Sequence, residues 1–469
     1  MPDISRRTFL SGALAAGLTV GTTSRLAGAA VGRRAPGRTA LTRLECRAVI
    51  IGSGFGGGVA ALRLAEAGVE VLVLERGIRW PTGPNAETFP HATHPDKRTS
   101  WLCSSLVGPL ATPEPVCEPY TGLIERVRGH GMDIMCGAGV GGGSLVYQGM
   151  SLQPTEEVFH AAFPEQLDYR RMDAVHYPRV ARMLGLATAP DELIQSEHYR
   201  AARLFATHVR SAGYPLAKVP MPIDWSFALR ELRGEMKPSY TNGDCALGVN
   251  NGGKHSVDVT YIAAAERTGR VTVAPLHNVT DIARAPDGRW LVSVDRIDTS
   301  GAVLEQKLIT TGALILAAGS PNTSRLLVRA AAKGQIPDLP DGIGANWGSN
   351  GDRIYAWTNL GEDFGAPQGG PVIYCSREWS DPVRANTVIQ ASIPPLPVNA
   401  RSTMLVGYGV SEGRGTFVYD SANDDAVLNW PADADSAARS RIHERVAGIA
   451  GGTGLLTDTT TLDTTTWHP

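Results

Sequence analysis

The chain has 469 residues, of which 43% are hydrophobic and 19% are charged, and its formal net charge is -2 at pH 7. This is the composition of a globular protein long enough for two or three domains. No basic cluster indicates nucleic-acid binding, and the 53 glycines and 31 prolines are too scattered for a collagen-like or low-complexity chain.

The first 29 residues are typical of an export signal. Arg6 and Arg7 precede a modest apolar run, Phe9 to Gly21, and the small residues from Ala27 to Ala29 resemble a cleavage site. The paired arginines favour twin-arginine export and a secreted protein, with an ordinary Sec signal or an amphipathic anchor as alternatives. We predict a signal peptide at 1–29 and a linker at 30–45.

The six cysteines include no C-x-x-C pair, so we predict no metal site. Export permits disulfides, and Cys103 and Cys117 flank a Pro-rich loop that would allow them to pair. The alternative is that all six are small buried hydrophobic residues, which we favour for Cys46 and Cys136 because both lie in apolar runs.

The stretch from Cys46 to Glu75 predicts a strand, a helix and a second strand around a glycine-rich turn. Gly52, Gly54 and Gly57 fit the pattern G-x-G-x-x-G. The first glycine would permit a tight turn, the second would let backbone approach a pyrophosphate, and the third would let the helix pack close to the sheet. Glu75 would accept hydrogen bonds from a ribose diol, so the stretch indicates a dinucleotide site.

Two later stretches favour a flavoprotein over a simple dehydrogenase. The run Gly137–Met150 holds a second glycine cluster whose backbone can lie against a flat ring. The apolar run Leu314–Ala318, followed by Gly319 and a helix, predicts a late strand of the same sheet. Alternating strands with two turns precede it, over 269–301. We therefore expect a dinucleotide domain interrupted by a large insertion.

Five stretches carry a family resemblance: "HPDKRTSW" from His94, "GVGGGSLV" from Gly139, "GKHSVDVTYIAAAERTGRVTV" from Gly253, "GTFVYD" from Gly415 and "LNW" from Leu428. In these stretches the chain resembles the glucose-methanol-choline (GMC) family of FAD oxidoreductases, and within it the bacterial cholesterol oxidases. The resemblance implies an α/β fold with an α+β insertion and non-covalent FAD. It implies a discontinuous Rossmann-like FAD-binding domain at 46–150 and 248–345, and a β-sheet-based substrate-binding domain at 151–247 and 346–469.

The resemblance also implies the residues that bind the cofactor. It assigns the pyrophosphate turn, the adenosine ribose, the flavin border and the adenine contact to these positions: Gly52, Gly54, Phe55, Gly56, Gly57, Glu75, Gly142, Gly143, Tyr147, Met150 and Val279. Relatives have Asn-Gly where this chain has Tyr147 and Gln148, which changes the surroundings of the flavin.

The proton-handling residue that the resemblance implies is His468, in "TWHP" at the end of the sequence. Histidine suits this role because its pKa lies near neutral pH. In relatives this motif continues into a glycine turn, a strand of the FAD sheet, a helix and an Asn partner. The resemblance thus implies that this sequence lacks the final segment of the FAD-binding domain, and we expect such a chain to bind FAD weakly and turn over slowly.

A second catalytic position of cholesterol oxidases is occupied differently in this chain. Relatives use a buried Glu to isomerise the steroid double bond, and Ser392, in "VIQASIPPLP", stands at that position. A serine hydroxyl cannot exchange protons near neutral pH as a carboxylate can. Gln390 replaces an aromatic residue. We expect oxidation of the alcohol with little or no isomerisation.

The sequence therefore predicts a secreted, monomeric FAD-dependent oxidase that converts 3β-hydroxysteroids to 3-ketosteroids and reduces O2 to H2O2. The Pro-rich stretch Ser104–Gly122 matches a lid over the sterol entrance in relatives and could contact a membrane surface transiently, with a plain surface loop as the alternative. Two other interpretations stay open. One is a GMC oxidase or dehydrogenase of another bulky alcohol, and the other is a truncated, non-catalytic chain.

Overall fold

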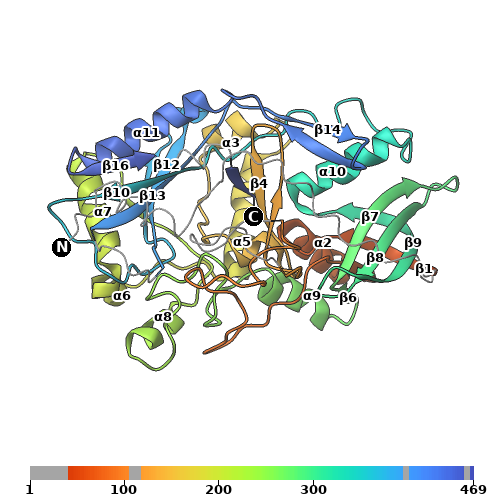
Figure 1. The fold of residues 1–469 in the computed structure, drawn as a ribbon, viewed down its shortest axis with the longest axis horizontal. Coiled ribbons are helices and arrows are strands. Elements are labelled where there is room, and N and C mark those ends of the chain that lie inside the picture. The colour runs from red at the N-terminus through yellow and green to blue at the C-terminus, as the bar shows by residue number, and fades with distance from the viewer. Residues whose placement is uncertain (1–40, 105–117, 395–400, 459–464, 469) are drawn as a thin grey trace, which may run out of the picture.

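The computed structural model of the protein describes residues 41–104, 118–394, 401–458 and 465–468. Two six-stranded sheets lie on opposite sides of the molecule, and a smaller sheet with β4 (Asp133–Gly137) lies between them (Figure 1). The predicted signal peptide lies outside the described residues. Strand β1 (Leu41–Ile51) begins inside the predicted linker, at Leu41 rather than at Cys46.

The first sheet joins a parallel part to an antiparallel part, in the order β6-β2-β1-β9-β8-β7. Strand β1 pairs in parallel with β2 and β9, and β2 with β6, while β7, β8 and β9 form an antiparallel meander. The other strands of this sheet are β2 (Val71–Leu74), β6 (Val271–Ala274), β7 (His277–Arg284), β8 (Trp290–Ile297) and β9 (Val303–Leu316). The sheet confirms the α/β fold class that the sequence predicts.

The apolar end of β1 is buried on both faces, as a parallel strand between two helical layers must be. Alternate residues of Ala48–Ile51 belong to opposite cores. One core contains α2 (Phe55–Glu66) and α9 (Ala263–Arg267), and the other contains α10 (Gly319–Ala332). This explains why the sequence shows a continuous apolar run here rather than an alternating pattern.

The second sheet is antiparallel, in the order β16-β10-β13-β12-β11-β5. Helices α7 (Arg200–Ser211) and α11 (Ser436–Ala450) cover one of its faces. Its strands are β5 (Ala217–Lys218), β10 (Arg353–Thr358), β11 (Tyr374–Glu378), β12 (Asn386–Ala391), β13 (Ser402–Gly409) and β16 (Leu455–Asp458).

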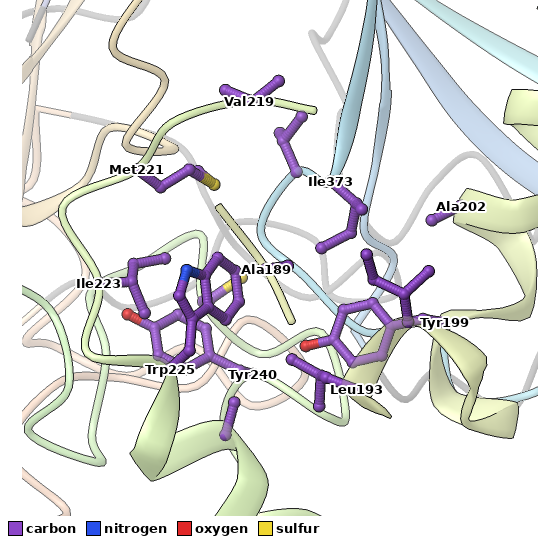
Figure 2. Packing of buried hydrophobic residues seen from close by; sticks show 14 of the residues in the cluster. Ala189, Leu193, Tyr199, Ala202, Val219, Met221, Ile223, Trp225, Tyr240 and Ile373 are labelled. Atoms are coloured by element: carbon purple, nitrogen blue, oxygen red, sulfur yellow. The ribbon is translucent and has the colours of Figure 1, made fainter. Parts of the chain in front are cut away.

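The opposite face of this sheet is covered by an apolar core rich in aromatic rings (Figure 2). The rings of Trp225 and Tyr240 lie 6.1 Å apart beside Ile223, and Tyr199 lies near Leu193.

The remaining helices are short: α3 (Glu156–Ala162), α4 (Tyr169–Arg171), η2 (Met172–His176), α5 (Tyr177–Leu184), α6 (Asp191–Gln195), η3 (Glu197–Tyr199), α8 (Trp225–Leu232), η4 (Asp258–Ile262) and η5 (Pro382–Arg384).

The small central sheet has the order β17-β4-β3, with β3 at Ile124–Val127 and β17 at Thr465–His468. A separate hairpin, β14 (Thr416–Asp420) and β15 (Asp425–Asn429), contacts α10. Its residues fall in the predicted substrate-binding segment 346–469, yet they pack on a helix of the predicted FAD-binding domain. The limits of the two domains stay a prediction.

Candidate active site

A cavity of about 820 Å³ lies where parallel strands of the first sheet end. The last residues of β1 and β9, Ile51 and Leu316, line it, together with the first residues of helices α2 and α10. The second glycine cluster contributes a further wall. Open α/β sheets bind their ligands at this edge, so the cavity marks the candidate active site.

The turn after β1 is packed so closely that side chains do not fit. Gly52 has a φ of 94°, and a Cβ on it would overlap the backbone of Ala317. A Cβ on Gly57 would overlap the carbonyl oxygen of Gly52, so α2 lies directly against the turn. Helix α2 begins after Gly54 without a side-chain cap, so the backbone N–H groups of its first turn are available to a phosphate.

Glu75, at the end of β2, is buried and lines the cavity. Its Oε2 accepts hydrogen bonds from the Ser53 backbone N–H at 3.2 Å and the Ser53 hydroxyl at 2.6 Å, and its Oε1 accepts from the Gly77 N–H at 2.9 Å. A carboxylate accepts about four hydrogen bonds. Glu75 therefore retains capacity for one ribose hydroxyl, while its other bonds hold the glycine turn.

The second glycine cluster is tied to the first by the hydroxyl of Ser53, which the sequence analysis did not single out. The Gly141 N–H donates to Ser53 Oγ at 3.2 Å. Ser144 Oγ donates to the Gly141 carbonyl at 2.7 Å and accepts from the Val257 N–H at 2.9 Å. Gly142 and Gly143 line the cavity at the start of the 3-10 helix η1 (Gly142–Leu145). A small hydroxyl residue inside the G-x-G turn is the only sequence signal for this link.

The structure brings most of the predicted cofactor residues to one cavity. Its lining includes Gly52, Gly54, Phe55, Gly56, Glu75, Gly142, Gly143 and Val279. Gly57 lies beneath the turn instead, Tyr147 contacts the ring of Phe55, and Met150 packs against the core of the second sheet. Their direct contact with a cofactor stays a prediction.

A partly buried ion pair that sequence reasoning missed also lines the cavity. Arg76 Nη2 lies 2.5 Å from Glu125 Oε2, and the Asn322 side-chain amide donates to the same oxygen at 3.1 Å. Burial alone would raise the pKa of Glu125, but the charge and hydrogen bond of Arg76 outweigh it and lower this pKa to about 2. The pair joins β2 to β3 and stays ionised at neutral pH. No local motif predicts this arrangement, because Arg76, Glu125 and Asn322 come from three distant segments of the sequence.

Ser392 lies just after β12, buried, with its Oγ 3.6 Å from the thiol of Cys245. Gln390 is also buried, and its amide donates to the Ala391 carbonyl at 2.6 Å and to Thr403 Oγ1 at 3.2 Å. Gln390 is thus held by hydrogen bonds within the second sheet. The end of the predicted isomerase stretch, from Pro395, lies outside the described residues.

The cysteine predictions have mixed outcomes. Cys103 is disulfide-bonded, whereas its expected partner Cys117, like most of the predicted lid, lies outside the described residues. Cys136 is free and buried as expected, and burial raises its pKa to about 12. Cys46 is free and only half-buried.

The backbone of His468 lies beside the cavity wall. Strand β17 runs parallel to β4, and in this register His468 is opposite Cys136, which lines the cavity. The side chain of His468 lies outside what the structure describes, so its catalytic role stays a prediction. Among the described residues no group of His, Cys, Asp and Glu could hold a metal ion, and none of the described helices is long and apolar enough to cross a membrane.

The fold and the cavity together define a dinucleotide-binding α/β protein with an attached antiparallel sheet. The family model described as GMC oxidoreductase matches residues 47–349. The chain belongs to the GMC oxidoreductase family, whose members are FAD-binding flavoproteins. FAD is therefore its cofactor, and the uncapped start of α2, the side-chain-free turn and the remaining acceptor capacity of Glu75 fit this group.

Curated relatives include two cholesterol oxidases. One, from Mycobacterium tuberculosis (strain CDC 1551 / Oshkosh), is 31% identical over 66% of this chain and 52% of its own length. The other, from Acinetobacter baumannii, is 26% identical over 70% of this chain and 59% of its own length. A long-chain-alcohol oxidase from Arabidopsis thaliana is 34% identical over 25% of this chain and 13% of its own length. The chain spans about half the length of the curated relatives it matches.

Solved structures support the fold. A pyridoxine 4-oxidase from Mesorbium loti has a TM-score of 0.55 at 14% identity, and the match covers 89% of this chain and 82% of the other. A fungal aryl-alcohol oxidase has a TM-score of 0.54 at 14% identity, covering 88% and 84%. At this identity the likeness shows the architecture alone.

Proposed function

We propose that the protein oxidises a 3β-hydroxysteroid to the 3-ketosteroid and reduces O2 to H2O2. The observation that carries the proposal is the likeness to two cholesterol oxidases, which extends over about two thirds of the chain. The electron balance is complete: the alcohol loses two electrons and two protons, and O2 gains both to become H2O2. FAD supplies the intermediate two-electron acceptor when it is bound.

The residues of the chain have three tasks in this reaction. The glycine turn and the start of α2 hold the cofactor phosphates, and Glu75 holds the ribose. His468, at the end of β17, takes the hydroxyl proton of the alcohol, a role that suits a histidine near neutral pH. The core of the second sheet supplies the apolar surroundings of a steroid.

A second candidate function is oxidation of another bulky alcohol. It is favoured by the likeness to a long-chain-alcohol oxidase and by the hydrogen-bonded Gln390 at a position that is aromatic in cholesterol oxidases. The two functions differ in substrate and share the chemistry. A third candidate, a chain without catalytic activity, would lack the flavin colour or any turnover.

The test is a peroxide assay on the FAD-loaded protein with cholesterol, androstane-type 3β-alcohols, long-chain alcohols and benzyl alcohol. We expect peroxide with the sterols above all other alcohols. Peroxide with a long-chain or aryl alcohol alone would establish the second function. Yellow protein that consumes no alcohol would contradict both.

The same sterol reaction tests the role of Ser392. Because the Ser392 hydroxyl faces a thiol and cannot act as a carboxylate base, we expect the non-conjugated 5-en-3-one to accumulate. Ultraviolet absorbance distinguishes it from the conjugated 4-en-3-one. Appearance of the conjugated ketone at the rate of peroxide formation would show that another residue moves the proton.

A further inference from the structure

A second, smaller cavity of about 250 Å³ adjoins the cofactor cavity. Four residues line both cavities and so form the partition between them: Glu125, Arg325, Asn423 and Asp425. The last two belong to the β14–β15 hairpin, which packs on α10 (Figure 1), and Asp424 of the same hairpin also lines the cofactor cavity. The smaller cavity reaches the surface at the exposed residue Arg128. The hairpin therefore stands between the cofactor cavity and solvent.

The two ends of this hairpin are held in different ways. Its base is anchored, because Phe417 and Leu428 are buried in one core with Trp347. Its tip, residues 421–425, contributes no side chain to that core and is mostly exposed. Segments with few buried apolar contacts open more easily than the rest of a fold. The tip depends instead on ionic contacts with α10.

Helix α10 presents a row of three cations to the hairpin tip. Arg325, Arg329 and Lys333, which directly follows the helix, are spaced four residues apart and so lie near one face. Arg325 Nε donates to Asp425 Oδ1 at 3.0 Å. Lys333 Nζ and Arg329 Nη2 donate to Asp424 Oδ2 at 2.7 Å and 3.2 Å. Two adjacent aspartates of the tip are thus paired with three cations of the helix.

Asp424 is ionised at neutral pH and has an unusual backbone conformation. Hydrogen bonds from Lys333 and Tyr419 lower its pKa to about 2. Its φ is 50°, in the left-handed region that Asp and Asn enter more readily than other residues with a side chain. Replacement by Asn therefore removes the charge and preserves the conformation of the turn.

Other walls of the cofactor cavity are held more firmly than the hairpin tip. Gly52 packs directly against the backbone of Ala317, and the ends of β1 and β9 are paired in the first sheet. These walls cannot separate without breaking the sheet. An exposed ion pair is weaker, worth about two- to fivefold in an equilibrium constant. The tip can therefore move at lower cost than the glycine turn and the strand ends.

We propose that the hairpin tip is a gate of the cofactor cavity, which opens to let FAD in or out and closes through the ion pairs of Asp424 and Asp425 with α10. When the tip moves away from α10, the two cavities join and the cofactor cavity opens to the surface. Salt screens exposed ion pairs, so the gate should open more often at high ionic strength. The inference concerns the cofactor and does not depend on which alcohol is oxidised.

The experiment measures the rates of FAD binding and release in the variant Asp424→Asn/Asp425→Asn. Binding is followed after rapid mixing of cofactor-free protein with FAD, and release after dilution of the loaded protein, with flavin fluorescence as the signal. A gate acts on passage in both directions, and the tip pairs with α10 whether or not FAD is bound. We therefore expect both rates to rise about four- to 25-fold, the effect of two exposed ion pairs, with an unchanged dissociation constant.

Asp287→Asn is the matched control. Asp287 also lies in a hairpin turn, between β7 and β8, and its Oδ2 accepts from Arg289 Nε at 2.8 Å, but it does not line the cavity. This variant should bind and release FAD at the rates of the wild type. Potassium chloride should accelerate both steps in the wild type and in Asp287→Asn, and much less in the double variant, whose screened pairs are already absent.

Three results would overturn the inference. Wild-type rates in the double variant would show that FAD passes elsewhere. Faster release alone, with weaker affinity, would mean that the two aspartates stabilise the bound cofactor rather than control its passage. Faster binding alone would mean that they only repel the anionic cofactor. Because no alcohol is present, the outcome is independent of the proposed function, which the peroxide assay tests separately.

Discussion

At the scale of single residues, Lys254 is a buried ionisable group held against the backbone that follows the second glycine cluster. It is 6% exposed, and its amine donates to two backbone carbonyls. Burial lowers its pKa from 10.5 to about 7, although Cys245 and Asp258 oppose the change. A neutral amine has two N–H groups, which matches the two carbonyls, so the site suits the uncharged form.

This pKa predicts how stability depends on pH. Between about pH 7 and 10.5 the unfolded chain keeps a proton on Lys254 that the folded chain has released, so stability rises with pH across this window. The contribution is about 1.4 kcal/mol per pH unit within it. We expect the free energy of unfolding in urea to rise more steeply from pH 7.5 to 8.5 in the wild type than in Lys254→Met, by about that amount.

Lys254→Met also leaves two carbonyls unpaired, so it should be less stable at every pH. Lys237→Met is a suitable control, because Lys237 is exposed and pairs with Glu87 at the surface. Parallel pH slopes for the wild type and Lys254→Met would show that Lys254 keeps its ordinary pKa in the folded protein.

Residue roles were predictable where a local motif specifies them. The spacing of the first glycine motif and Glu75 predicts a dinucleotide site, and Gly52, Gly54 and Glu75 do line the cavity. The contacts of Ser53 and Lys254 were not predictable, because their partners lie between 22 and 109 positions away in sequence. Tyr147 stood out in the sequence as an unusual residue, but its edge-on contact with the ring of Phe55 depends on tertiary packing.

At the scale of elements, the turn between β1 and α2 contains two glycines with different roles, Gly54 and Gly57. A Cβ on Gly57 would strike the backbone of Gly52, whereas a Cβ on Gly54 would meet only Gly142 Cα at 3.7 Å, beside the cavity. Gly57 is needed for packing, and Gly54 leaves space for a ligand.

We therefore expect Gly57→Ala to destabilise the protein without cofactor by about 1–3 kcal/mol, through backbone overlap. Gly54→Ala should change that stability by less than about 1 kcal/mol and weaken FAD binding about tenfold or more. Thermal melts of cofactor-free protein and FAD titrations measure the two effects. Equal loss of stability in both variants would contradict the division of roles.

The pairing of β17 with β4 gives a prediction for His468. If His468 accepts the substrate proton, His468→Asn should reduce turnover about 10²- to 10⁴-fold while flavin absorbance stays unchanged. His160→Asn, in exposed helix α3, serves as the control and should retain full turnover. Undiminished turnover in His468→Asn would assign the proton transfer to another group.

Helices and strands were predictable where their hydrophobic periodicity is strong. The tertiary contacts between them were not predictable. The buried end of β1, helix α2 and the meander follow from apolar runs and turn residues. The extension of β1 back to Leu41 was missed because residues 41–45 are mostly exposed and form a strand only by pairing with β9. The contact of the β14–β15 hairpin with α10 depends on tertiary packing that no local pattern contains.

At the scale of the whole molecule, the first sheet is assembled from two distant parts of the sequence, 41–74 and 271–316. The sequence predicted this interruption because the glycine turn and the late apolar run around Leu314 both belong to a dinucleotide fold. The arrangement of the second sheet was less accessible, since its strands are short and joined by irregular segments. Family membership therefore follows mainly from the first sheet, and the substrate depends on the second.

The parallel pairing of β1 with β9 also determines at which stage of folding the cavity can form. Thr42 Oγ1 donates to Glu305 at 2.6 Å across 263 positions of sequence, and the cavity floor needs Gly52 and Ala317 in contact. Bringing such distant segments together costs chain entropy before any contact repays it, which makes this topology slow to form. During synthesis no cofactor site can close until the ribosome has passed residue 317. FAD capture is therefore a late folding event, and bound flavin is a sign that the first sheet has been completed.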